Sequence, residues 1–343
     1  MNSEWSPKDS SFYTDPPELF DCLNEPSTSV LNVSCVLIPL PSGNSGQHTF
    51  TIQGGASGHL TLASSPDPNT PVITYDIAIQ SSSSSLKKVS FYQPPPGPVS
   101  STDFLIDTPI TMDQHGPTDP PTCIRFDITM YIPRSLRQLT VDVSTPIQIT
   151  FSPQAHIELD SLSISIKNPH PRSRIDSSES MQARSLSVEM DTGLIHGLLS
   201  IGESSKITNL NGQIQLDTIP NAPMDIFSPS TAHLETTCFG DVDIRYLRNK
   251  AYRQRPIESW HTMGSQNKST GRFDYGCSGF NGLLYSNSTK YNLTNPGTWK
   301  TKKLDANGED PWPIMIGNRT GEDKIYIRSG SGSIILPDNL HII

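Results

Sequence analysis

The sequence SLSVEMDTGLIHG at residues 185–197 contains the pattern that decides the fold. In it an apolar residue is followed five positions later by Gly193, and another apolar residue comes two positions after that. The same unit recurs nineteen residues further on, in SKITNLNGQIQL at residues 205–216, with Gly212 in the place of Gly193. Alternation favours a β-strand with one buried face, and glycine permits the positive φ of a sharp corner. Each unit is therefore predicted to be a strand, a glycine corner and a second strand.

Two further copies of the unit lie in the C-terminal part, centred on Gly332 and, with a weaker match, on Gly282. A repeat of about nineteen residues is typical of one coil of a β-solenoid, in which each coil stacks its apolar row on the next. A meander of hairpins and coincidental alternation in a β-sandwich are the alternatives. Because Gly193 and Gly212 share the same offsets on both sides, we favour stacked coils, with Gly193, Gly212 and Gly332 each turning a corner.

The composition agrees with a β-rich chain. Of 343 residues 30 are Pro and 23 are Gly, and charged residues make up 17%, against about 25% in typical globular proteins. From residue 48 onward apolar and polar residues alternate, and turn-forming residues interrupt them every eight to twelve positions. We expect the all-β class, as a β-solenoid or β-helix-like stack of short strands with a disordered N-terminal tail.

Three regions are expected along the chain. Residues 1–44 form a Pro- and Ser-rich tail with too few apolar residues to offset its ordering entropy. Residues 45–115 form an N-terminal region of β-strands, and residues 116–343 form the solenoid. Residues 242–260 mix apolar and basic residues without a helical stripe, so we predict a loop there with at most one short helix.

The repeated units resemble the putative-adhesin domain, a family found in bacterial proteins and in many uncharacterised fungal ones. Its units read as strand, Thr/Ser-Asn/Asp-Gly, strand, and they fold as a β-solenoid. Residues 185–197 and 205–214 carry the resemblance, and GSGSI at residues 330–334 is similar to the family's closing unit. The resemblance covers about residues 120–220 and the C-terminus, and it implies a structural or adhesion-type role.

Charge and targeting signals limit the classes of partner. A net charge of −9 excludes a uniformly attractive field for nucleic acid or anionic lipid. No secretory signal opens the chain, and its most apolar run, residues 36–40, is far shorter than the ~20 residues of a membrane span. Five glycosylation sequons and the resemblance favour a cell-surface or secreted location; the sequons are at Asn32, Asn267, Asn287, Asn292 and Asn318. The five cysteines are expected to be separate thiols, although Cys22 and Cys35 lie close enough to pair.

The sequence predicts no enzyme, no cofactor and no metal. Motifs for zinc peptidases, P-loops, dinucleotide binding and EF-hands are absent, and the histidines have no metal-ligand spacing. The alternative is a carbohydrate-active hydrolase or lyase on a β-helix. Such enzymes resemble one another in ordered Asp pairs, a His-Gly and an Arg-x-Lys, of which His196-Gly197 and Arg248-Asn249-Lys250 are present. The close pair Asp241 and Asp243 follows the His-Gly instead of preceding it, and glycoside cleavage requires paired carboxylates.

Two sets of side chains are candidate binding surfaces. Flat rings could stack on sugar faces, with a core role for most of them as the alternative; these are Trp260, Tyr275, Phe280, Tyr285, Tyr291 and Trp299. A basic cluster could bind an anion, with a solvated face paired to acidic loops as the alternative; its members are Arg245, Arg248, Lys250, Arg253 and Arg255. We expect a non-catalytic structural or adhesion-like protein that contacts carbohydrate or protein surfaces.

Overall fold

The structure is a computed structural model, and every regular element that it describes is a β-strand. The prediction of the all-β class is confirmed. The described residues are 29–40, 46–67, 69–81, 89–93, 101–109, 124–168, 170–221, 230–247, 255–264, 269–275, 280, 282–286, 291–294, 301–303, 314–317, 321–328 and 331–335.

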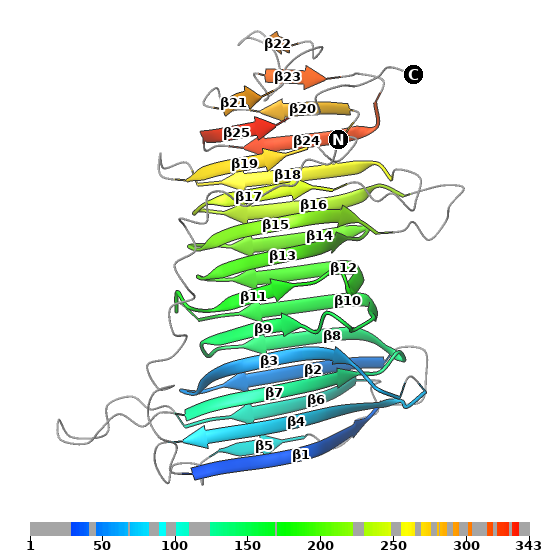
Figure 1. The fold of residues 1–343 in the computed structure, drawn as a ribbon, viewed down its shortest axis with the longest axis vertical. Coiled ribbons are helices and arrows are strands. Elements are labelled where there is room, and N and C mark those ends of the chain that lie inside the picture. Colours follow the sequence, from blue (N-terminus) through cyan, green and yellow to red (C-terminus); the bar gives the residue numbers. More distant parts are fainter. Residues whose placement is uncertain are drawn as a thin grey trace, which may run out of the picture.

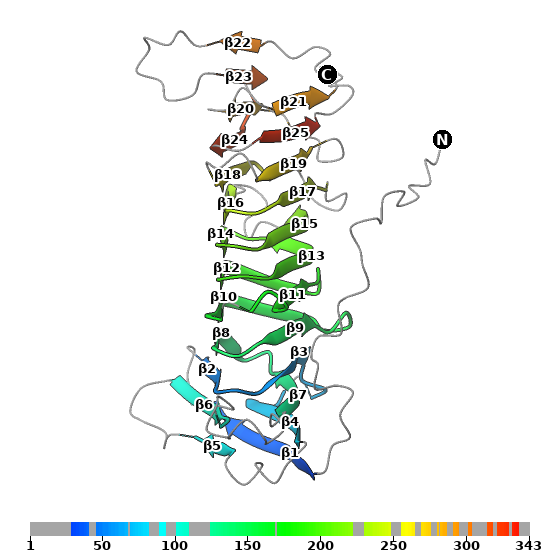
Figure 2. The same cartoon turned by 90° about the vertical axis from the view of Figure 1, so that its left-hand side faces the viewer.

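The strands form two long sheets that face one another across the core (Figures 1 and 2). Sheet A has the order β1 (Ser29–Pro39), β4 (Val72–Ser81), β7 (Ile124–Ile132), β3 (Ser57–Ser64), β9 (Ile147–Phe151), β11 (Arg174–Ser177), β13 (Leu194–Ile201), β15 (Gln213–Pro220), β17 (Val242–Tyr246), β19 (Thr270–Asp274), β25 (Ser331–Ile335) and β21 (Tyr291–Thr294). Sheet B has the order β22 (Thr301–Lys303), β23 (Ile314–Gly317), β20 (Gly282–Ser286), β24 (Asp323–Arg328), β18 (Ile257–Met263), β16 (Ala232–Cys238), β14 (Ser204–Asn209), β12 (Met181–Met190), β10 (Ile157–Ile166), β8 (Leu136–Val143), β2 (Gly46–Gln53), β6 (Ser101–Asp107) and β5 (Ser90–Tyr92).

From β8 to β19 the chain alternates between the two sheets, and each strand from β8 to β17 pairs in parallel with the strand two places further on. We call one strand of sheet B together with the next strand of sheet A a coil. In-register pairing stacks the inward side chains in rows, of which one runs through Val141, Ile164, Val188 and Ile207. These rows belong to one continuous hydrophobic core, which also crosses the expected boundary at residues 115/116.

Glycine corners join sheet B to sheet A in successive coils. Gly193 has φ +122°, and a Cβ atom there would lie 2.1 Å from the carbonyl oxygen of Ser173 in the preceding coil. A Cβ atom on Gly212 would lie 2.0 Å from the carbonyl oxygen of Gly193, and one on Gly240 would lie 1.9 Å from that of Gly212. The two glycines of the repeat therefore stand at stacked corners, as predicted, and no larger residue fits there.

The other two copies of the repeat differ from the prediction. Gly332 lies inside β25, where it pairs with Gly271, so it turns no corner. Gly282 begins β20 in sheet B and stands at a corner of the opposite direction, from sheet A to sheet B. Both copies keep the apolar spacing of the unit. Gly332, however, stands two residues beyond the corner position that Gly193 occupies, and Gly282 stands at the corner that leads into the other sheet.

Two segments expected to lack strands contain them. Strand β1 lies within residues 1–44 and pairs with β4, so the predicted tail does not extend over residues 29–39; residues 1–28 lie outside the described part of the chain. Residues 242–260 hold β17 and the start of β18, because apolar residues there alternate with charged ones. Arg245, one of the basic side chains that obscured this period, lies on an outward position of β17.

Coils at both ends of the stack are out of sequence order. The coil β2/β3 lies between β6/β7 and β8/β9, and the coil β24/β25 lies between β18/β19 and β20/β21. Beyond them lie antiparallel strands: β1, β4 and β5 at one end, and β22 and β23 at the other (Figure 1).

A buried histidine joins the two sheets near each of these ends. His48 of sheet B bonds to the hydroxyl of Tyr75 in sheet A, and its Nδ1 lies 2.8 Å from Thr102 Oγ1. His261 of sheet B lies 2.9 Å from the hydroxyl of Tyr246 in sheet A and 2.7 Å from Thr236 Oγ1. Burial lowers the pKa of His48 to about 4 and that of His261 to about 3, so both rings are neutral at pH 7.

Replacing Gly193 by Ala should lower the free energy of unfolding by about 2–4 kcal/mol, because the new methyl group meets a backbone carbonyl and the φ angle is strained. Urea denaturation measures the loss. Gly264→Ala is the control, since its closest contact would be 3.2 Å. Equal stability of the Gly193 variant and the parent would contradict the corner geometry.

The free energy of unfolding should fall as the pH drops below 6.5. His48 and His261 are then protonated in the unfolded chain but stay neutral in the folded chain, because their folded-state pKa values are lower. Each histidine contributes about 1.4 kcal/mol per pH unit until its folded-state pKa is reached. Urea midpoints between pH 7 and 5 measure this slope. His261→Gln should remove the part of the slope that this histidine contributes, whereas the exposed His156→Gln serves as the control. A slope unaltered by His261→Gln would refute the assignment.

Candidate functional site

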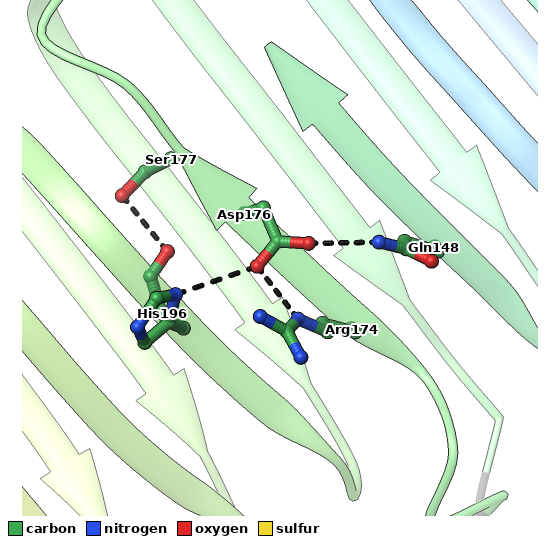
Figure 3. Close-up of polar contacts among 5 residues, drawn as sticks. All are labelled: Gln148, Arg174, Asp176, Ser177 and His196. Atoms are coloured by element: carbon green, nitrogen blue, oxygen red, sulfur yellow. Dashed lines mark hydrogen bonds and ion pairs between the residues drawn. The ribbon is translucent and has the colours of Figure 1, made fainter. Parts of the chain in front are cut away.

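A connected cluster of polar side chains lies on the outer face of sheet A (Figure 3). Asp176 of β11 accepts a hydrogen bond from Arg174 Nε of the same strand at 2.6 Å. It also accepts one from Gln148 Nε2 of β9 at 2.9 Å, and its carboxylate lies 3.5 Å from His196 Nδ1 of β13. These side chains point outward because they alternate with buried residues such as Ile175. The cluster therefore ties three consecutive coils together.

The electrostatics of the cluster keep Asp176 ionised. Partial burial acts to raise its pKa, but the hydrogen bonds from His196, Arg174 and Gln148 and the charge of Arg174 outweigh burial, and the pKa is lowered. A carboxylate with a lowered pKa and three donors is a poor general acid. Its chemistry is that of a hydrogen-bond acceptor that fixes its neighbours.

A serine, a histidine and an aspartate meet here without forming a catalytic triad. Ser177 Oγ donates to the backbone carbonyl of His196 at 3.1 Å. In a triad the serine hydroxyl would instead donate to the histidine ring, which the aspartate orients from the other side. His196, which the sequence presents as isolated, thus has a carboxylate partner from the preceding coil.

Ion pairs continue along the same face. Arg245 of β17 forms a bidentate pair with Asp217 of β15, with Nε to Oδ1 at 2.8 Å. Arg272 of β19 lies 4.0 Å from Asp243 and 3.8 Å from Asp274. Burial raises the pKa of Asp243, and the charges of Asp274 and Asp217 act in the same direction against those of Arg272 and Arg245. Asp241, its predicted partner, instead accepts hydrogen bonds from the backbone NH and hydroxyl of Thr270.

The predicted basic cluster does not form one surface in the described part of the chain. Arg245 is held by Asp217 on the outer face of sheet A. Arg255 is 3% exposed and donates to the carbonyls of Ser230 and Thr231, and burial lowers its pKa. The remaining members lie outside the described residues; they are Arg248, Lys250 and Arg253.

Two members of the predicted aromatic set lie together on the outer face of sheet B. Trp260 of β18 stacks on Tyr326 of β24, with centroids 3.8 Å apart and planes at 12°. Tyr285 of β20 stacks on the other face of Tyr326 at 4.8 Å and 6°. Arg328 lies 5.5 Å from the Trp260 ring centroid. We call Trp260, Tyr326 and Tyr285 the ring column.

Stacking within the ring column limits which aromatic faces are open to a sugar. Both faces of Tyr326 are covered by neighbouring rings, so a sugar cannot stack on it face to face. Tyr275 and Phe280 are 1% and 2% exposed and belong to the core, as the alternative interpretation held. The side chain of Tyr291, and Trp299, lie outside the described part. Tyr326 was missed by the sequence reasoning, although it alternates with Ile325 and Ile327 as an outward strand residue.

Apolar side chains pack the interior of the described part of the chain. A small apolar cavity between the coils from β9 to β15 leaves about 10 Å³ of space, which is about that of one water molecule. Within the described ranges, no three His, Cys, Asp or Glu side chains gather as metal ligands. The same ranges contain no helix that could cross a membrane.

No family model and no curated protein matches this chain. Solved structures that align with it include a putative cell adhesion protein from Clostridium sporogenes, at 9% identity and a TM-score of 0.27. A putative adhesin from Bacteroides fragilis aligns at 11% identity and 0.39, and a putative lipid binding protein from Parabacteroides distasonis at 10% and 0.30. Each alignment covers 90% of this chain and 96–98% of the other. Because every TM-score lies below 0.5, these likenesses carry no argument about function.

Replacing Asp176 by Asn should lower the free energy of unfolding by about 1–2 kcal/mol, since the ionised acceptor of three donors is lost. Thermal or urea denaturation at pH 7 measures it. The matched control is Asp160→Asn, an exposed aspartate on β10, which should change stability by less than about 0.5 kcal/mol. Equal effects of the two substitutions would refute a stabilising role for the cluster.

Proposed function

We propose that this protein is a non-catalytic scaffold with an adhesion-like role. The observation that carries the proposal is that charged side chains on the outer face of sheet A bond to one another between coils. On sheet A, Asp176 and Asp217 are bonded laterally to side chains of neighbouring coils instead of converging on a cleft. Such bonds hold coils in register, whereas catalysis requires polar groups that meet at a substrate.

The stacked coils suit a protein that presents surfaces. Parallel strands lie about 4.8 Å apart, so each coil lengthens the stack by a fixed step and adds one strand to each outer face. Both outer faces are long, and one continuous hydrophobic core lies between them. Contact with a carbohydrate or protein surface along these faces is the proposed mechanism, and a secreted or cell-surface location is the setting in which it would serve.

One observation favours a second candidate function, a carbohydrate-active hydrolase or lyase. Asp243 has a raised pKa and lies near the carboxylates of Asp217 and Asp274 on the outer face of a parallel sheet. A carboxylic acid with a raised pKa beside an ionised carboxylate is the pair that glycosidic cleavage uses. Here Arg245 and Arg272 already pair with these carboxylates, which favours the scaffold.

Incubating the full chain with a panel of neutral and acidic polysaccharides distinguishes the two functions. We expect binding to glycan or protein surfaces without any release of reducing ends or unsaturated sugars. The Asp243→Asn chain should bind as the parent does and should likewise release no products. Asp160→Asn controls for the loss of a surface charge. Product formation by the parent chain that disappears in Asp243→Asn would overturn the scaffold in favour of the enzyme.

A further inference from the structure

The coil β24/β25 occupies a slot between two coils that follow one another in the sequence. β24 pairs in parallel with β18 on one side and β20 on the other, and β25 pairs likewise with β19 and β21. Among the described residues, β20 has only β23 as a further partner, and β21 has none. The coil β20/β21 is thus joined to the rest of the stack through the C-terminal coil.

If the coil β24/β25 left the slot, β20 could pair directly with β18 and so close it. This is possible because β20 and β24 carry equivalent residues at the positions that face β18. Leu284 of β20 stands in register with Ile325 of β24, and Tyr285 stands in register with Tyr326. Direct pairing of β20 with β18 would therefore place a ring on Trp260 again. The connection 275–281 is also adequate, since similar connections in the stack range from 202–203 to 221–231.

Specific contacts favour the inserted coil. Asp323, which is 5% exposed, accepts a hydrogen bond from the backbone NH of Ile257 at 2.8 Å. In the closed slot Gly282 would stand beside Ile257 and could not supply this acceptor. A Cβ atom on Gly282 would lie 1.8 Å from the carbonyl oxygen of Asp323, so β20 fits closely against the inserted strand. Insertion is therefore the ground state, with closure as the competing arrangement.

We propose that β24/β25 is an exchangeable coil, which a second copy of this chain can supply to the slot. The fit of the occupant is seen directly, because the same residues fill the slot within one chain. When the slot closes, the coil β20/β21 stays paired with the stack. This pairing lowers the free-energy cost of releasing β24/β25. A released coil has two unpaired strands with inward isoleucines, for which the same slot in another copy is the matching partner. Exchange would link copies of the scaffold at this end, a property beyond the proposed function.

Single cysteines on facing outward positions test the exchange in the full chain. Glu258 of β18 and Lys324 of β24 are register partners, and parallel neighbours about 4.8 Å apart lie within the span of a disulfide. With the native cysteines replaced by serine, the chain with both Glu258→Cys and Lys324→Cys should form an internal disulfide, which establishes the pairing. Failure to form it would overturn the proposal.

Chains with Glu258→Cys alone and Lys324→Cys alone are then refolded together and oxidised. We expect a covalent dimer, at a yield at least about fivefold above that of the control mixture of Ser187→Cys and Lys206→Cys chains. The control residues are register partners in coils that follow one another in the sequence and have no slot between them. Equal yields would overturn the proposal. If serine replacement prevents folding, light scattering of the unmodified chain refolded at high concentration replaces the test, and a purely monomeric product overturns it.

Discussion

The stack depends on the close approach of a backbone carbonyl to a glycine Cα in the next coil. At Gly193 and Gly212 the oxygen of the preceding coil occupies the space that a Cβ atom would need. This contact sets how near these two corners can lie, and the strands on either side of them pair in parallel and in register. Because the pairing is in register, inward side chains form apolar rows and outward ones form polar or aromatic columns.

Much of the fold could be predicted from alternation and glycine spacing, because both act within one unit of the chain. The glycines at 193 and 212 correctly indicated corners between strands. The order of coils at the ends could not be predicted, since Leu284 and Ile325 suit the same neighbour equally well. Residues 242–260 were misinterpreted because Arg245 of β17 and the basic residues that follow it in the sequence hid a period of two.

The polar site was harder to predict than the fold, because its contacts join residues of different coils. His196 acquires Asp176 as a partner only through the register of β11 on β13. The aromatic set failed for a related reason: ring content alone does not distinguish outward Tyr285 from buried Tyr275. Stacking on Tyr326 then turns rings that looked like a sugar platform into lateral contacts between coils.

The order of the end coils has a consequence for how the chain folds during its synthesis. The strands β20 and β21 leave the ribosome before the segment that separates them from β18 and β19 exists. Folding from the N-terminus onward therefore cannot complete this end one coil at a time. The coil β20/β21 therefore cannot reach its native neighbours until residues 323–335 have been translated and have entered the interior of the stack.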